Sequence, residues 1–225
     1  MKQSVLVIGL GRFGSAAARE LMRLGHDVLA VDRDEAAVNE IAPEVTQALQ
    51  LDAADLEALK GIGAGEFDHA IVAISGQGEP SVFATMALKQ LGVGNVVSKA
   101  GTPLHGAILE RVGADRIVFP EREMGVRIAH LFAYPNVIDY VDVAPDFGLV
   151  VVRVPPDFVG RTLGEIDLGA RFQLTPVALR RGDRLTVQPS DGERVEPGDV
   201  LILVGSDDGL ARLPNSPAAN RPNER

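Results

Sequence analysis

The chain has 225 residues, 46 % of them hydrophobic and none of them cysteine, so it can bury one large or two modest cores but has no disulfide, thiolate nucleophile or cysteine-ligated metal. Its formal net charge is −9 and it has no basic run, which argues against a surface for nucleic acid or anionic lipid. No apolar stretch approaches the ~18 residues that cross a bilayer, and a strand entered by Val5 leaves no room for a signal peptide, so we expect a soluble, cytoplasmic protein that meets a membrane only through a partner protein.

The first predicted element is a buried strand that runs directly into a glycine-rich turn. Residues Val5 to Ile8 are apolar without alternation, as in parallel strands that are buried on both faces. The turn Gly9-Leu10-Gly11-Arg12-Phe13-Gly14 leads into a helix predicted over residues 14–24. We expect its three glycines, in order, to make the tight turn, to let backbone N–H groups approach a pyrophosphate, and to allow close packing of helix and strand. The pattern indicates a nucleotide or dinucleotide site.

Two side chains of this turn are candidates for ligand contact. Arg12 lies in the first turn of the helix, where a cation opposes the helix macrodipole at a cost of about 0.3–1 kcal/mol. A bound polyphosphate would offset that cost; the alternative is a solvated arginine whose charge is screened. Phe13 is more simply explained by packing than by stacking on a base.

Asp32 ends the second predicted strand, residues 28–31, eighteen residues after Gly14. This is the place of the carboxylate that accepts hydrogen bonds from two ribose hydroxyls in dinucleotide-binding folds. It would also repel a 2′-phosphate and so disfavour an NADP-type cofactor, although Arg33 weakens that exclusion. The alternative is a solvated residue at a strand end.

The alternation of short apolar runs and helical patterns continues to about residue 136. It predicts successive βαβ units, and hence a Rossmann-like, doubly wound parallel sheet of six strands. The further strands are expected at residues 47–51, 70–74, 96–99 and 116–119, and the further helices at 34–42, 55–61, 81–91 and 103–112. Gly25 and Gly92 suit left-handed caps, and Pro103 suits a first helical turn.

The carboxyl ends of such strands should line one crevice. Asp52 and Ala53 follow the third strand, and Asp52 is either a ligand contact or the N-cap of the next helix through the Asp52-x-x-Asp55 spacing. Ser75 and Gly76 follow the fourth strand, where the serine could meet a ribose or a phosphate.

The fifth strand ends in Lys99, followed by Ala100 and Gly101. A lone lysine at that depth is a candidate phosphate contact. His105 opens the next helix where the sheet edge meets the crevice, and it is the one histidine we single out. The other three are scattered without metal-ligand spacing and are expected at the surface or at strand ends.

A helix predicted from Glu121 to Phe132 comes after the sheet is complete. Glu121 either complements the helix dipole or contacts a ligand. The apolar positions of this helix are Met124, Val126, Ile128, Ala129, Leu131 and Phe132. Such a helix needs another surface to cover it, from a second domain or from a second subunit.

Beyond residue 136 the pattern changes to a small α+β module. Its strands are expected at residues 149–154, 174–179, 184–187 and 200–204, with short helices near 163–167 and 207–213. Pro176 inside a strand predicts an edge or a bulge. The tail, residues 214–225, is expected to be disordered.

The second module has few residues for acid–base chemistry. It contains no histidine, lysine or cysteine, and Tyr140 is its only tyrosine. Because an enzyme on a Rossmann half usually takes its acid, base or nucleophile from the second domain, hydride transfer is disfavoured and no catalytic residue is assigned. A small NAD-dependent oxidoreductase and a free-standing nucleotide sensor remain the alternatives to the interpretation that follows.

With these pieces in order, the chain resembles the cytoplasmic regulatory subunits of bacterial potassium uptake systems, the KtrA and TrkA proteins, which consist of an RCK N-terminal and an RCK C-terminal domain. The resemblance extends to about residue 213 and is nearer to KtrA, because TrkA has two tandem copies. The residues that carry it are Gly9-Leu10-Gly11-Arg12-Phe13-Gly14, Val31-Asp32, Leu51-Asp52-Ala53, Leu88-Lys89-Gln90-Leu91-Gly92, Val112-Gly113-Ala114-Asp115-Arg116-Ile117, Phe119-Pro120-Glu121 and Met124-Gly125-Val126-Arg127.

This resemblance implies that ATP, ADP or NAD(H) binds a first domain that ends near residue 136. It implies that Arg12 reaches the terminal phosphates, that Asp32 and Arg33 lie at the ribose, and that Asp52 and Ala53 lie near the adenine. Around the phosphates it places Ser75, Gly76, Lys99 and His105. Glu121 would lie near a divalent cation between subunits.

The same resemblance implies partners and a mode of action. Two chains would exchange the helix 121–132 in a homodimer, and dimers would form a ring of eight chains. Nucleotide identity would bias the shape of the ring, which would gate a membrane potassium-transporter subunit of the KtrB or TrkH type. Cyclic di-AMP binds the C-terminal module, residues 137–213 here, in relatives of this kind, but Pro176 and Phe172-Gln173-Leu174 depart from the expected apolar pattern, so that ligand stays open.

Overall fold

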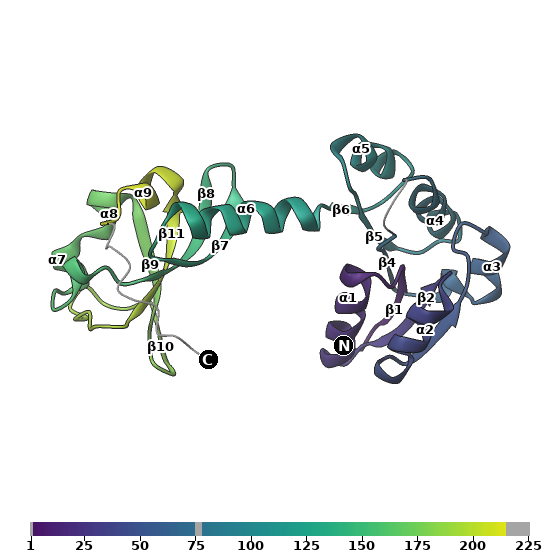
Figure 1. Cartoon of the computed structure of the whole chain (residues 1–225), viewed down its shortest axis with the longest axis horizontal. Coiled ribbons are helices and arrows are strands. Elements are labelled where there is room, and N and C mark those ends of the chain that lie inside the picture. Colours follow the sequence, from purple (N-terminus) through teal and green to yellow (C-terminus); the bar gives the residue numbers. More distant parts are fainter. Residues whose placement is uncertain (1, 75–77, 215–225) are drawn as a thin grey trace. The chain divides into compact units, whose positions relative to one another are not determined.

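The structure is a computed structural model that describes residues 2–74 and 78–214. The chain forms two compact units that divide after Arg122, within helix α6 (Pro120–Ala133) (Figure 1). Ser75, Gly76 and the tail beyond residue 214 lie outside the described residues.

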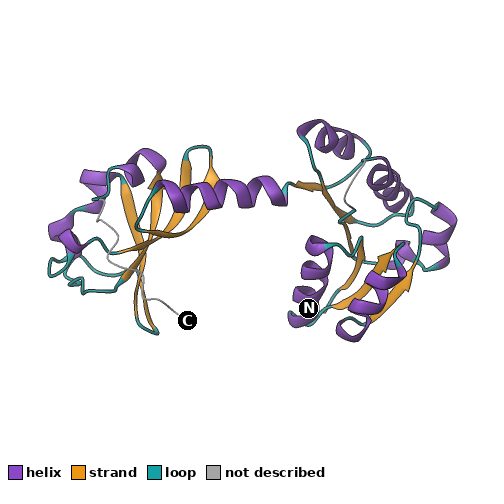
Figure 2. Ribbon diagram, viewed as in Figure 1, coloured by secondary structure: helices purple, strands orange, loops and turns teal. Residues whose placement is uncertain are grey.

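The first unit contains the predicted parallel sheet of six strands, in the order β3-β2-β1-β4-β5-β6. The strands are β1 (Ser4–Ile8), β2 (Asp27–Asp32), β3 (Gln47–Gln50), β4 (His69–Val72), β5 (Asn95–Lys99) and β6 (Arg116–Val118). The connecting helices are α1 (Arg12–Arg23), α2 (Glu35–Ile41), α3 (Leu56–Gly61), α4 (Glu79–Gln90) and α5 (Pro103–Arg111), and strands and helices alternate along the chain (Figure 2). The strand order reverses between β1 and β4, so the crevice for a ligand is expected outside their carboxyl ends.

Both faces of this sheet are covered, as the unalternating strand sequences require. Leu6 and Ile8 of β1 belong to one buried cluster, whereas Val5 and Val7 of the same strand belong to another. Because successive side chains of a strand point to opposite faces, the two clusters lie on opposite sides of the sheet. The predicted caps Gly25 and Gly92 have φ of +89° and +92°, the left-handed conformation that favours glycine.

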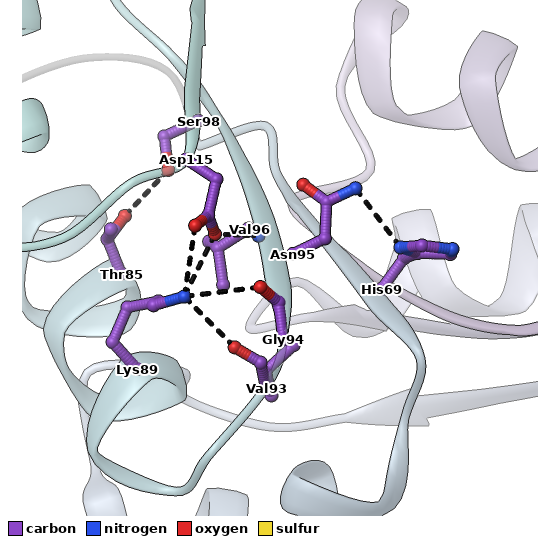
Figure 3. A network of polar contacts seen from close by, with 9 residues as sticks. All are labelled: His69, Thr85, Lys89, Val93, Gly94, Asn95, Val96, Ser98 and Asp115. Carbon is purple, nitrogen blue, oxygen red and sulfur yellow. Dashed lines mark hydrogen bonds and ion pairs between the residues drawn. The ribbon is translucent and has the colours of Figure 1, made fainter.

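A polar network fastens α4 to the sheet and joins two segments that the sequence had singled out (Figure 3). The Lys89 ammonium donates to Asp115 at 2.9 Å and to the backbone carbonyls of Val93 and Gly94 at 3.2 and 3.4 Å. Asp115 accepts the Val96 N–H at 2.6 Å, and these bonds, the backbone one first, hold the pKa of its carboxyl below the usual range. The two segments therefore act together to hold the end of α4 against β5.

We expect Asp115→Ala to lower the free energy of unfolding by about 1–3 kcal/mol, because the buried Val96 N–H and the Lys89 ammonium lose their acceptor. Urea denaturation followed by circular dichroism measures this. Since the folded-state pKa is lowered, the contribution should be fully present above the ordinary aspartate pKa of about 3.9 and be lost only as the pH falls through the lower folded value. Glu20→Ala, which breaks a surface pair within α1, is the control. A change below about 0.5 kcal/mol for Asp115→Ala, in the range of ordinary surface substitutions, would contradict this role.

The second unit is built on an antiparallel five-stranded sheet in the order β10-β9-β11-β8-β7. Its strands are β7 (Val137–Ala144), β8 (Phe147–Arg153), β9 (Leu174–Arg181), β10 (Arg184–Val187) and β11 (Val200–Ser206), and its helices are α7 (Leu163–Ile166), α8 (Leu168–Phe172) and α9 (Asp207–Ala211). Pro176 lies where the β9–β11 register shifts, opposite Leu203, so the predicted bulge is confirmed. Strand β7 and helix α8 were not predicted from the sequence.

Helix α6 is only partly covered by its own chain. Leu131 packs against the core of the second unit, and the Arg127 guanidinium pairs with Asp139 on β7. The ring of His130 stacks on Tyr140 with 3.6 Å between centroids. By contrast, Met124, Ile128 and Phe132, spaced four residues apart, are 50 %, 43 % and 83 % exposed. They form one apolar stripe that the described residues of this chain leave uncovered. Leu131, grouped with them in the sequence, belongs to the other side.

Among the described residues, no helix combines the length and the apolar character that crossing a membrane requires.

Candidate functional site

A crevice of about 740 Å³ opens at the carboxyl ends of the strands of the first unit. It is lined by the ends of β1 and β2, the segments after β3 and β4, and the first turn of α4. The lining residues are Ile8, Gly9, Leu10, Gly11, Asp32, Arg33, Asp34, Ala37, Leu51, Asp52, Ala53, Ala54, Ala73, Ile74, Glu79 and Pro80. The structure thus brings together the glycine turn, Asp32 and Asp52, as the topology predicts.

The glycine turn fits closely against the sheet. Gly9 has φ of +93°, and a Cβ there would lie 2.8 Å from the Ile74 nitrogen. A Cβ on Gly14 would lie 1.8 Å from the Gly9 carbonyl oxygen, so α1 can approach β1 only with glycine at this place. In front of Gly11 there is open space, and α1 starts there without a side-chain cap. Within the part of the chain that the structure describes, no side chain caps the first N–H groups of α1, which is the arrangement that an anion at a helix start requires.

Asp32 is held by the backbone on both sides. One carboxylate oxygen accepts the Leu10 N–H at 2.6 Å, and the other accepts the Asp34 N–H at 2.9 Å. Each carboxylate oxygen has a second lone pair that these bonds leave available. Asp32 thus links the glycine turn to the end of β2 and can still accept hydroxyl donors in the crevice.

Other polar side chains give the crevice an acidic lining. Asp34, Asp52 and Glu79 line it along with Asp32, against one guanidinium, that of Arg33. Asp52 accepts the Ala54 N–H at 3.0 Å, whereas Asp55 caps α3. The N-cap alternative for Asp52 is therefore wrong, because the capping carboxylate is three residues further on. Ala53 is buried in the core beneath the crevice.

Arg12, Lys99 and Glu121 form a second charged group at the ends of β1, β5 and β6, outside the crevice lining. Lys99 is almost completely buried, and its ammonium pairs with the Glu121 carboxylate at 2.6 Å. The hydrogen bond with Lys99 is the main cause that lowers the pKa of Glu121, and the charge of Arg12 lowers this pKa to a smaller extent. Arg12 is exposed at the first position of α1, and Phe13 beside it is half-buried.

The structure places His105 and Gly101 away from the crevice. They line a separate groove of about 430 Å³ between α4 and α5, which shares only Glu79 with the crevice. Ala100 is buried at the end of β5.

The carboxylates and histidines of the described residues are dispersed, and the one tyrosine of the second module is engaged in a hydrogen bond. The described residues contain no cluster of three or more His, Asp or Glu side chains that could hold an ion, and Glu121 pairs with Lys99. Tyr140 is buried and donates its hydroxyl hydrogen to Asp207 at 2.7 Å. Burial first, and this bond next, raise the pKa of Tyr140 far above its usual value, which makes it a poor acid or base at neutral pH.

Sequence reasoning missed two polar side chains of the crevice, Asp34 and Glu79. Asp34 caps α2 by accepting the Ala36 N–H at 3.0 Å, and Glu79 with Pro80 starts α4. Both carry ordinary helix-start signals, which could have marked them as lying at the carboxyl edge of the sheet.

Comparison with known proteins assigns both units. The TrkA-N domain family matches residues 5–120, and the TrkA-C domain family matches residues 149–216. The Ktr system potassium uptake protein C of Bacillus subtilis (strain 168) is 39 % identical over 213 residues, which cover 95 % of this chain and 96 % of that protein.

Two solved structures share the fold. The RCK domain of GsuK superposes with a TM-score of 0.65 at 18 % identity, over 95 % of this chain and 47 % of the other. The GsuK channel bound to NAD superposes with a TM-score of 0.64 at 17 % identity, over 94 % of this chain and 38 % of the other. The chain therefore spans less than half the length of each of these solved chains.

Proposed function

Since the chain belongs to the family of TrkA-N and TrkA-C domain proteins that includes the Ktr potassium uptake proteins, we propose that it is a nucleotide-sensing regulatory subunit of a potassium uptake system. The observation that carries this proposal is the crevice: a glycine turn, an uncapped helix start and Asp32 meet at the strand-order reversal of a chain that matches a Ktr protein over almost its whole length. The role is regulatory rather than catalytic.

The crevice is suited to an adenine nucleotide. Asp32 would accept the ribose hydroxyls, the N–H groups at Gly11 and the start of α1 would hold a phosphate, and the segment from Asp52 to Ala54 would meet the base. The crevice lining has four carboxylates and one guanidinium, and this excess of negative charge disfavours a ligand that carries many negative charges. Binding of ATP or ADP therefore needs Arg12, whereas NAD(H), with two phosphate charges, needs it less. The NAD-bound GsuK channel supports a ligand of this class through the shared fold.

The assembly follows from the apolar stripe of Met124, Ile128 and Phe132. We infer that a second copy covers it in a homodimer, that dimers join into a ring, and that the ring acts on a membrane potassium-transporter subunit. A divalent cation at Glu121 would need further donors from another chain, because the Glu121 carboxylate already pairs with Lys99.

We expect Arg12→Ala to lower the affinity for ATP more than that for NADH, because the guanidinium at the start of α1 gains most from the ligand with the larger terminal charge. Calorimetric titration of the purified protein with each ligand measures both losses. Arg19→Ala, which removes an arginine of the same helix that pairs with Glu44 at the surface, should bind both ligands as the wild type does.

Equal losses for the two ligands would mean that Arg12 serves only the turn or a pyrophosphate common to both. A wild-type protein that binds neither ATP nor NADH would remove the basis of the proposed function. Steady oxidation of NADH or reduction of NAD at more than ~0.1 s⁻¹ with a panel of hydroxy acids and aldehydes would favour the oxidoreductase alternative.

A further inference from the structure

One wall of the crevice is the first turn of α4, where Glu79 and Pro80 face the proposed nucleotide. This helix starts at Gly78 without a side-chain cap. The position of this first turn therefore depends on the contacts that Gly78 and α4 make on the side away from the crevice.

Ser81 supplies that support on the side of α4. Its side chain is buried, and its hydroxyl donates to the Gly78 carbonyl oxygen at 2.7 Å. The same hydroxyl oxygen lies 2.8 Å from Nε2 of His105 on α5. His105 is in turn fixed at the start of α5, because its backbone N–H donates to the Thr102 hydroxyl that caps the helix.

The neighbours of His105 determine which group donates the hydrogen in its contact with Ser81. The Gly101 N–H can only donate, and it faces Nδ1 of His105 at 3.4 Å. The hydrogen of a neutral imidazole must then be on Nε2, from which it is donated to the Ser81 oxygen. The Ser81 hydrogen goes to the Gly78 carbonyl, which can only accept. An unbroken chain of donors thus runs from the start of α5 to the start of α4.

Packing strengthens the same link. A Cβ built on Gly78 would lie 3.0 Å from both Cδ2 and Nε2 of His105, so the ring rests directly on the backbone of Gly78. His105 itself is absent from the crevice lining and lies in the groove behind α4. It is placed to orient the wall without touching the ligand.

We propose that His105 is a positioning residue for nucleotide binding, which acts through Ser81 to hold the first turn of α4 as a wall of the crevice. This inference rests on the proposed function, because it presupposes that the crevice binds a nucleotide. It differs from the role around the phosphates that the family resemblance implied for His105.

The test is the affinity of the full-length protein for NADH, followed by the fluorescence of the dinucleotide, in three variants. His105→Ala should weaken binding about tenfold, the change expected for the loss of one hydrogen bond and its packing. His105→Gln should bind within about threefold of the wild type, because its side-chain amide keeps an N–H donor for Ser81. His69→Ala is the matched control: His69 begins β4, at the amino ends of the strands and so away from the crevice, and its ring hydrogen-bonds to Asn95 at 3.1 Å.

The outcomes separate the inference from its premise. Unchanged affinity in His105→Ala, or a loss in His105→Gln as large as that in His105→Ala, would overturn the positioning role while nucleotide binding by the wild type stands. No binding by the wild type would refute the proposed function itself. If His105→Ala fails to fold, His105→Gln is compared with Ser81→Ala: a loss confined to Ser81→Ala supports the inference, and equal affinities contradict it. Nitrogen NMR of the ligand-free protein should also find the His105 hydrogen on Nε2, and a hydrogen on Nδ1 would break the donor chain.

Discussion

Asp32→Ala is expected to weaken the binding of NADH and of ATP alike by roughly 1.5–3 kcal/mol, which is about ten- to a hundredfold in affinity. The carboxylate accepts the Leu10 and Asp34 N–H groups, so its removal takes away the ribose acceptor and also loosens the glycine turn. Because the ribose is common to both ligands, the two losses should be similar, unlike those of Arg12→Ala.

Calorimetric titration with each nucleotide measures the effect. Asp27→Ala is the matched control, since Asp27 lies at the other end of the same strand and pairs with Lys2 at the surface. Wild-type affinity in the Asp32 variant would show that the ribose lies elsewhere. Thermal unfolding without nucleotide, compared between the two variants, shows how much of the loss comes from the turn itself.

Ile128→Glu is expected to convert a dimer into a monomer. Burying the side chains of Met124, Ile128 and Phe132 is worth ~1.5–3 kcal/mol each when they are fully covered, and a carboxylate in the middle of the stripe would lose its hydration on association. Multi-angle light scattering on the purified chain should give the dimer mass for the wild type and the monomer mass for the variant.

Leu185→Glu serves as the control, because Leu185 is another exposed apolar residue, on the edge strand β10. It should keep the dimer mass. A monomeric wild type, or a dimer that persists in Ile128→Glu, would contradict the assignment of the stripe to a second copy of this chain.

The parts of the fold that depend on local chemistry were predictable from the sequence. The six parallel strands and the helices between them were confirmed. Strands β1, β2 and β4 contain unbroken apolar runs, and Gly25 and Gly92 follow helices in the left-handed conformation. Strand β7 was not predicted because it is an edge strand. Asp139 and Asp142 interrupt its apolar residues, and Val141 and Val143 are exposed. The sequence of this segment therefore lacks an apolar periodicity strong enough to predict a strand.

The residues of the candidate site likewise include some that local sequence patterns predict and some that depend on tertiary packing. The glycine turn and Asp32 could be found because residue type and spacing define them within one βαβ unit. The capping role of Asp55 rather than Asp52 depends on where the helix starts, which sequence patterns fix only to within a few residues. The contact of His105 with Ser81 joins two residues that are 24 positions apart in the sequence. No local pattern around either residue predicts that they meet. Such pairs follow from tertiary packing.

The most direct test of the central claim is potassium uptake by cells of the source organism in which the gene is deleted and then restored. Restoring the wild-type chain is expected to return the uptake rate to that of the parent cells, whereas restoring Asp32→Ala, produced at the same level, should leave the rate of the deleted cells. Uptake that is unaffected by the deletion, or is restored equally well by Asp32→Ala, would contradict a nucleotide-sensing role in potassium uptake.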